Sequence, residues 1–140
     1  MELAPDHPGH LRPPTTEDIL AIGAAFLAQL PEPFRELVSP VPIAVEDWAD
    51  EATLDAMEID DPLDLTGLYR GIPIGERHSA LPPEEPEMIF LYRMPILVEW
   101  CERGCALEEV VGDVLAHEIG HHLGMDEAAA LRLEDRTLED

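Results

Sequence analysis

Lysine is absent from this chain of 140 residues, and all eight of its basic residues are arginine. Acidic residues number 31, which gives a net charge of -23 at pH 7. A surface of this sign repels the phosphate backbone of nucleic acids, so we expect no nucleic-acid binding. The charge favours solubility, and it would also attract basic partners or metal cations.

The sequence also lacks segments that could enter a membrane or direct export. It contains no run of about 18 consecutive apolar residues, the length that a membrane helix needs. Its first residues have neither the basic region nor the apolar region of a signal peptide. We therefore predict a cytoplasmic protein with no membrane association.

Cysteine is scarce, with only Cys101 and Cys105. In a reducing compartment we expect both to be thiols. Their spacing of four residues would allow a thiolate metal site or a redox pair, but two small buried side chains is the simpler interpretation. Their role stays open at this stage.

Proline and glycine are frequent, with 14 and 9 residues, which predicts many turns and short elements. Residues 1–15 are rich in proline and show no periodic pattern, so we expect a flexible arm there. Residues 16–140 would then form a single domain. The predicted elements are a helix with Thr16 as its N-cap, strands at 41–49, 65–74 and 88–94, and helices at 50–58, 96–104, 107–124 and 126–138. This order indicates an α+β fold in which a small mixed or antiparallel sheet packs against the helix at 107–124.

The clearest chemical signal lies in that helix, where His117, Glu118 and His121 form the pattern HExxH. Residues four apart share one helical face, so the two imidazoles can bind one metal ion. Zinc accepts imidazole nitrogens, and it lowers the pKa of a bound water to about 7. Glu118 projects about 100° round the helix, where its carboxylate can act as the general base on that water. The histidines fall beside Val110 and Val114 on the apolar side, so we expect them to face the core or a cleft.

A catalytic zinc ion needs a third protein ligand. Gly124 can turn the chain sharply after the helix, because glycine readily adopts a positive φ. Glu127 follows three residues later, and we expect it to be the third ligand of one zinc ion per chain. Asp126 is the rival, although it could instead cap the last helix, with Glu127 then favourable to the helix dipole. The alternative for the histidine pair is two core imidazoles bonded to main-chain carbonyls.

Three further polar residues could assist such a site. His122 is expected to point away from the ligand pair, either behind it or at the surface. Asp113 lies one turn before His117 and could orient its free nitrogen, with a solvated aspartate as an equal alternative. His78 falls in a polar loop at 75–87, where simple exposure is the plainer expectation.

With these residues in view, the chain resembles the small bacterial minimal zincin-like metallopeptidases. The segment HEIGHHLGMDE (117–127) carries the resemblance most specifically, and LYRGIPIGER (68–77) and LPPEEPEMIFLYRMPIL (81–97) carry it more loosely. The resemblance implies a compact zincin-like fold in which the strand at 88–94 aligns the substrate through a free edge. The family's third ligand is commonly aspartate, and here Glu127 takes its place. No methionine follows Met125, so the Met-turn of the metzincins is missing and the likeness is to a minimal zincin.

Together these features predict a zinc-dependent metallopeptidase that acts on a peptide or protein substrate. A structural zinc site closes all four positions with protein ligands, whereas the sequence offers only three. One alternative is a non-catalytic zinc-binding module with a regulatory or partner-binding role. Another is a metal-dependent hydrolase of a non-peptide amide. No pattern in the sequence names a particular substrate or an oligomeric state.

Overall fold

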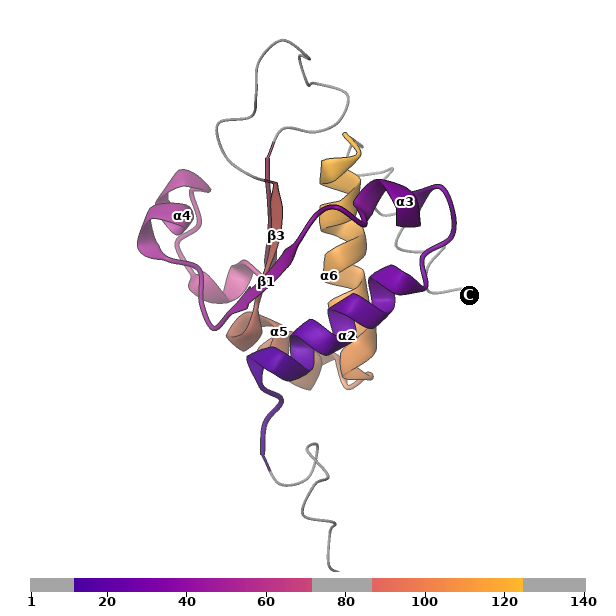
Figure 1. Ribbon diagram of the computed structural model, residues 1–140. Coiled ribbons are helices and arrows are strands. Elements are labelled where there is room, and N and C mark those ends of the chain that lie inside the picture. Colours follow the sequence, from indigo (N-terminus) through magenta and orange to yellow (C-terminus); the bar gives the residue numbers. More distant parts are fainter. Residues whose placement is uncertain (1–11, 72–86, 125–140) are drawn as a thin grey trace, which may run out of the picture.

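The computed structural model describes residues 12–71 and 87–124, and the structural statements below refer to these residues. Helices pack around one small sheet (Figure 1). In chain order the elements are α2 (Thr16–Ala28), α3 (Phe34–Val38), β1 (Ile43–Glu46), α4 (Glu51–Ala56), the short 3-10 helix η1 (Pro62–Asp64), β2 (Gly67–Arg70), β3 (Met88–Tyr92), α5 (Arg93–Arg103) and α6 (Leu107–His122). The predicted α+β class and the small mixed sheet are confirmed.

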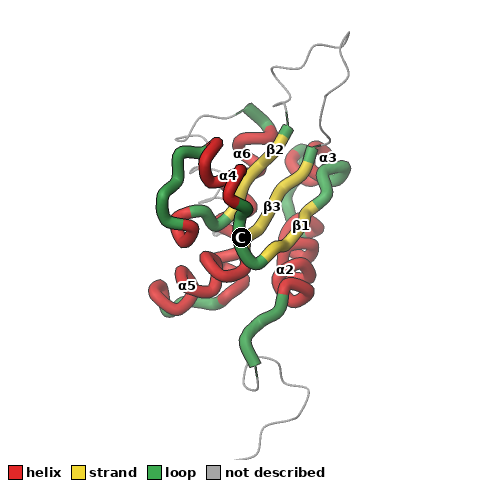
Figure 2. The backbone as a smooth tube through the Cα atoms, turned by 90° about the vertical axis from the view of Figure 1, so that its left-hand side faces the viewer, coloured by secondary structure: helices red, strands yellow, loops and turns green. Residues whose placement is uncertain are grey.

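The three strands are arranged in the order β1-β3-β2, as Figure 2 shows. Strand β1 runs parallel to β3, with Ile43 opposite Ile89, and β2 runs antiparallel to β3, with Tyr69 opposite Ile89. The prediction that the strand at 88–94 has a free edge is therefore wrong, because β3 is paired on both sides. The physical reason is burial: Ile89 and Leu91 are 0% exposed, and the most apolar strand takes the centre of the sheet.

Alternate residues of β3 supply two cores on opposite faces of the sheet. Ile89 and Leu91 belong to the larger cluster, which includes residues of α2 and α6, whereas Phe90 and Tyr92 pack in a smaller cluster with Leu54 of α4. Figure 1 shows α4 on one side of the sheet and α2 with α6 on the other. Burial raises the pKa of Tyr92 to about 12, so its hydroxyl stays protonated at neutral pH.

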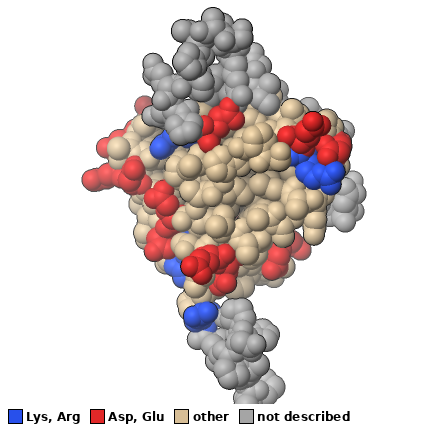
Figure 3. Space-filling model, in the orientation of Figure 1, with Lys and Arg blue, Asp and Glu red and all other residues tan. Residues whose placement is uncertain are grey.

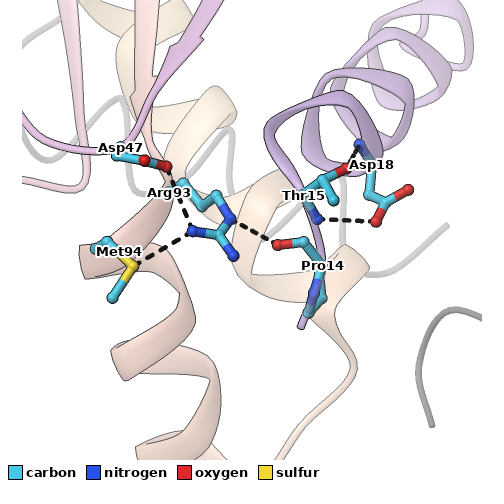
Figure 4. Close-up of polar contacts among 6 residues, drawn as sticks. All are labelled: Pro14, Thr15, Asp18, Asp47, Arg93 and Met94. Carbon is cyan, nitrogen blue, oxygen red and sulfur yellow. Dashed lines mark hydrogen bonds and ion pairs between the residues drawn. The ribbon is translucent and has the colours of Figure 1, made fainter. Parts of the chain in front are cut away.

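The N-terminus of α2 is capped by Thr15, one residue before the predicted cap (Figure 4). The Thr15 hydroxyl oxygen accepts the Asp18 N–H at 3.1 Å, and the Asp18 carboxylate accepts the Thr15 N–H at 2.8 Å. Thr16 was expected in this role, but its partner three residues on would be Ile19, which is apolar and 0% exposed. The cap falls on the threonine that has a carboxylate three residues ahead.

Replacing Thr15 with alanine is expected to lower the free energy of unfolding by about 1 kcal/mol, because the side chain satisfies one of the free N–H groups of α2. Thr16→Ala is the matched control, since it removes the same atoms from the next position and leaves the cap intact. Urea unfolding of the two variants measures the difference. A larger loss of stability in Thr16→Ala would show that the cap is at residue 16.

The chain passes directly from β3 into α5, which begins at Arg93 and not at residue 96 as predicted. Pro95 lies in the first turn of α5, where no N–H donor is required, so it starts a helix here instead of ending a strand. Arg93 also ties this junction to the N-terminus of α2: its Nε donates to the Pro14 carbonyl, and its Nη1 lies 3.3 Å from Asp47 (Figure 4). Gly104 ends α5 in the left-handed region with φ 64°, at the residue where the predicted helix 96–104 also ends.

Two further helices are not shared by the sequence prediction and the described residues. The short helix α3 was not predicted, and the predicted helix at 126–138 lies outside the described residues. The boundary at residue 15 between an arm and a domain stays a prediction.

Cys101 and Cys105 are free thiols, but Cys101 is exposed, so the expected burial of both is wrong. None of the helices in residues 12–71 and 87–124 combines the length and apolarity of a membrane span.

Candidate metal centre

Helix α6 carries the HExxH residues and is held along most of its length by the larger core. Its residues Val110, Val111, Leu115 and Ile119 are all 0% exposed. Gly124 follows the helix with φ 76°, the positive φ that was expected of it. A helix anchored over this length presents its last two turns as a rigid platform for polar side chains.

The structure brings His117, Glu118 and His121 together. One potential ligand atom from each residue lies within 4.8 Å of the others, and these three form the one such group found among the described residues. The two imidazole rings lie edge to face, with centroids 4.8 Å apart and planes at 71°. Both histidines are half-buried and Glu118 is 6% exposed. The imidazoles therefore lie where the core meets the surface, and they are not enclosed as two core histidines would be.

Glu118 is held by the edge of the sheet. Its Oε1 accepts the main-chain N–H of Tyr69 at 2.8 Å and lies 3.2 Å from Nδ1 of His121. The Tyr92 N–H donates to the Thr66 carbonyl, so Thr66 belongs to a hydrogen-bonded pair of this antiparallel ladder. Hydrogen-bonded and non-hydrogen-bonded residues alternate along such a strand, so the N–H of Tyr69, three residues further on, points away from β3. The strand edge that faces the HExxH residues is thus that of β2, and it corrects the assignment of this role to 88–94.

Gly67 allows β2 to approach α6 this closely. A Cβ atom at residue 67 would lie 2.5 Å from Cγ1 of Val114 and 3.5 Å from Cγ of Glu118. Neither Gly67 nor Tyr69 was singled out from the sequence as part of the site. The available signal was the glycine inside the predicted strand at 65–74, since such a glycine often marks a close approach of another element.

Gly67→Ala is expected to lower the free energy of unfolding by about 1–3 kcal/mol, the usual cost of overpacking a core. Gly23→Ala is a suitable control, because Gly23 is also buried but its added Cβ would come no closer than 3.3 Å to a side-chain atom. Alanine also favours a helix over glycine by up to about 1 kcal/mol, which offsets the tight 3.3 Å contact, so the control should lose less stability than Gly67→Ala. Chemical denaturation separates the two effects, and equal stability of Gly67→Ala and wild type would disprove the close contact.

Asp113 does not take either of the roles predicted for it. Its Oδ2 lies 2.8 Å from Nη2 of Arg103 in α5, and the residue is only 9% exposed, so it neither orients His117 nor lies in solvent. The hydrogen bond with Asp113 raises the pKa of Arg103. This ion pair, in which Asp113 is buried and Arg103 is exposed, joins α5 to α6, which is a structural role.

The other predicted residues divide into two groups. His122 is 2% exposed, so the surface alternative is wrong, and its predicted position behind the ligand pair stays a prediction. Its Nδ1 lies 3.2 Å from the Tyr69 hydroxyl and 3.5 Å from Oε2 of Glu87, and its Nε2 lies 3.2 Å from the Leu37 carbonyl. The remaining candidates, His78, Asp126 and Glu127, lie outside the described residues.

Charge is distributed unevenly over the surface. Figure 3 shows acidic side chains gathered at the margins of one face, while the centre of that face is uncharged. Three of the described arginines lie beside acidic groups: Arg35 beside Glu32 at 2.7 Å, Arg93 beside Asp47, and Arg103 beside Asp113. On this face the negative charge is thus spread round the rim and does not form a single cation-binding cluster.

Comparison with protein families identifies the family of this chain. A family model described as Zincin-like metallopeptidase matches residues 38–137, which is more than two thirds of the chain. The match begins at the end of α3, and it includes the whole sheet and α6 with its HExxH residues. No curated protein matches the sequence.

Proposed function

This chain belongs to the family of zincin-like metallopeptidases, and from that membership we propose that it is a zinc-dependent peptidase with Glu118 as its general base. The observation that carries the proposal is the convergence of His117, Glu118 and His121 within 4.8 Å at the end of one helix. Two imidazoles and a carboxylate are donor groups that suit zinc. The residues present therefore fit the metal that the family implies.

In this proposal His117 and His121 bind one zinc ion per chain. Glu127 is the third ligand, and Asp126 is its rival, because both follow the turn at Gly124. Glu118 is assigned to proton transfer and not to the metal, since its Oε1 already accepts the Tyr69 N–H. Three protein ligands leave one position for water or substrate, as in catalytic zinc sites.

When bound, zinc would supply a lowered water pKa and polarisation of the substrate carbonyl. Glu118 would take a proton on its carboxylate from the attacking water and deliver it to the amine that leaves. Its position supports this role: the side chain is 6% exposed, and the main-chain donor of Tyr69 holds one of its oxygens in place. A carboxylate fixed in this way keeps its second oxygen available for the proton.

The substrate would be an extended peptide that lies along the outer edge of β2, the edge that does not pair with β3. Among the described strands, β2 pairs only with β3, and its outward-facing Tyr69 N–H lies beside Glu118. The Tyr69 N–H is bound by Glu118, so an extended peptide would add to this edge through its other main-chain groups. It would then pass next to the general base and the two histidines.

Removal and return of the metal test this function. Treatment with a chelator should abolish peptide cleavage, and one equivalent of zinc should restore it, because the histidines alone cannot activate water. Cleavage of a fluorogenic peptide mixture, with zinc content measured in parallel, gives both quantities.

Cleavage that persists in metal-free protein would contradict the proposal. A chain that binds one zinc and cleaves no peptide would support the second candidate, a non-catalytic zinc-binding module. The excess of acidic residues would then favour a basic partner.

A further inference from the structure

His122 directly follows the HExxH segment and is fully enclosed by the fold. Its Nε2 lies 3.2 Å from the carbonyl of Leu37, near the end of α3. A carbonyl can only accept a hydrogen bond, so Nε2 is the nitrogen that carries hydrogen. This bond satisfies one of the last carbonyls of α3, which has no partner within so short a helix. The orientation of the imidazole is thereby fixed.

The other ring nitrogen of His122 faces Tyr69. Nδ1 lies 3.2 Å from the Tyr69 hydroxyl, and the two rings meet edge to face with centroids 5.3 Å apart. In the neutral imidazole Nδ1 accepts the hydroxyl hydrogen, and in the protonated one it donates to the hydroxyl oxygen, so the contact exists in both forms. His122 therefore links the side chain of Tyr69 to α3.

Tyr69 is consequently held at two points by one face of α6. Its hydroxyl contacts His122 and its main-chain N–H donates to Glu118 at 2.8 Å. Glu118 and His122 are four residues apart, so they lie one above the other on the helix. A single residue of β2 thus spans one turn of α6, with the predicted general base at one end and a buried histidine at the other.

The space round the Tyr69 hydroxyl leaves it little freedom. A Cβ atom at Gly71 would lie 2.8 Å from the hydroxyl oxygen, and Gly71 has φ 147°, a conformation that other residues rarely adopt. The Glu87 side chain borders the same place, with its Oε2 3.5 Å from Nδ1 of His122. The ring of Tyr69 is therefore confined, and its main-chain N–H is confined with it.

We propose that His122 and Tyr69 are positioning residues that hold the Glu118 carboxylate in its working orientation. His122 fixes the Tyr69 ring, the ring fixes the edge of β2, and the N–H on that edge fixes Glu118. The inference rests on the proposed function only for the role of Glu118 as general base. The positioning of its carboxylate does not depend on catalysis. Loss of His122 should release the Tyr69 N–H from Glu118 although His122 touches neither group of that hydrogen bond.

The chain contains only two tyrosines, which makes the test selective. Zinc-loaded protein labelled with ¹⁵N-tyrosine should show two amide signals, and the Tyr92 N–H, which donates to the Thr66 carbonyl at 2.9 Å, is an internal control. In His122→Phe the Tyr69 amide should shift and exchange its hydrogen roughly fivefold faster or more, as for one lost hydrogen bond. Glu118→Ala should move the same signal in the same direction, and the Tyr92 signal should stay in place in both.

Tyr69→Phe is the second variant, for the case in which His122→Phe does not fold. It removes only the hydroxyl, and with ¹⁵N-phenylalanine the amide at residue 69 appears as one extra signal. Faster exchange at this amide supports the proposal. In both variants kcat should fall by roughly tenfold with little change in KM, because a displaced base slows the chemical step more than binding.

Two results would overturn the inference. If Glu118→Ala moves the Tyr69 amide but His122→Phe and Tyr69→Phe leave it unchanged, His122 is only a core histidine with satisfied nitrogens. If Glu118→Ala also leaves the amide unchanged, Tyr69 does not hold the carboxylate at all. The amide signals do not depend on turnover. A chain that shows the expected amide shifts but cleaves no peptide would therefore contradict the peptidase proposal alone.

Discussion

Glu118→Gln is expected to leave the zinc content near one per chain while lowering the rate of peptide hydrolysis by at least about a hundredfold, the low end for a lost acid–base group. Glutamine keeps the size of the side chain and can still accept the Tyr69 N–H through its carbonyl oxygen. What it lacks is the ability to take a proton from water. The variant therefore separates proton transfer from metal binding in one residue.

Glu109→Gln provides the matched control for this variant. It makes the same chemical change in the same helix, but Glu109 is exposed in the first turn of α6, far along the helix from His117. Its zinc content and rate should equal those of the wild type. Zinc loss in Glu118→Gln would make Glu118 a ligand, and an unchanged rate would remove it from the chemistry.

The double variant His117→Ala, His121→Ala should contain almost no zinc. Both imidazoles belong to the one group of potential ligands found among the described residues, and a single remaining acidic ligand cannot hold zinc against buffer and water. Hydrolysis should be lost together with the metal. Elemental analysis of purified protein, with equilibrium dialysis against zinc, measures the stoichiometry.

His10→Ala is the control for that experiment, because it removes an imidazole that the sequence places in the predicted N-terminal arm. It should keep one zinc per chain. Zinc content that stays at one in the double variant would place the metal elsewhere and contradict the candidate centre.

The sequence predicted well what depends on local spacing. The apolar pattern and Gly124 together predicted a helix at 107–124, which is within two residues of the observed end of α6. The positions of His117, Glu118 and His121 along one helix then followed from the helical repeat alone. Gly104 likewise predicted the end of α5, because its conformation is a property of a single residue.

Contacts between distant segments could not be predicted in this way. The hydrogen bond from Tyr69 to Glu118 joins residues 49 apart, and that from Tyr69 to His122 joins residues 53 apart. The place of β3 at the centre of the sheet is also set by pairing with two distant strands, so its composition alone could not distinguish a central strand from an edge. The same limit explains Asp113, whose partner Arg103 lies on another helix.

The central claim is tested most directly by incubating the zinc-loaded chain with a diverse peptide library in water enriched in ¹⁸O. Peptide-bond hydrolysis by a zinc-dependent enzyme should create new carboxyl termini that each carry one ¹⁸O atom, detected by mass spectrometry. These termini should be absent from metal-free protein and strongly reduced with zinc-loaded Glu118→Gln. A library left intact by a chain that holds one zinc ion would contradict the account.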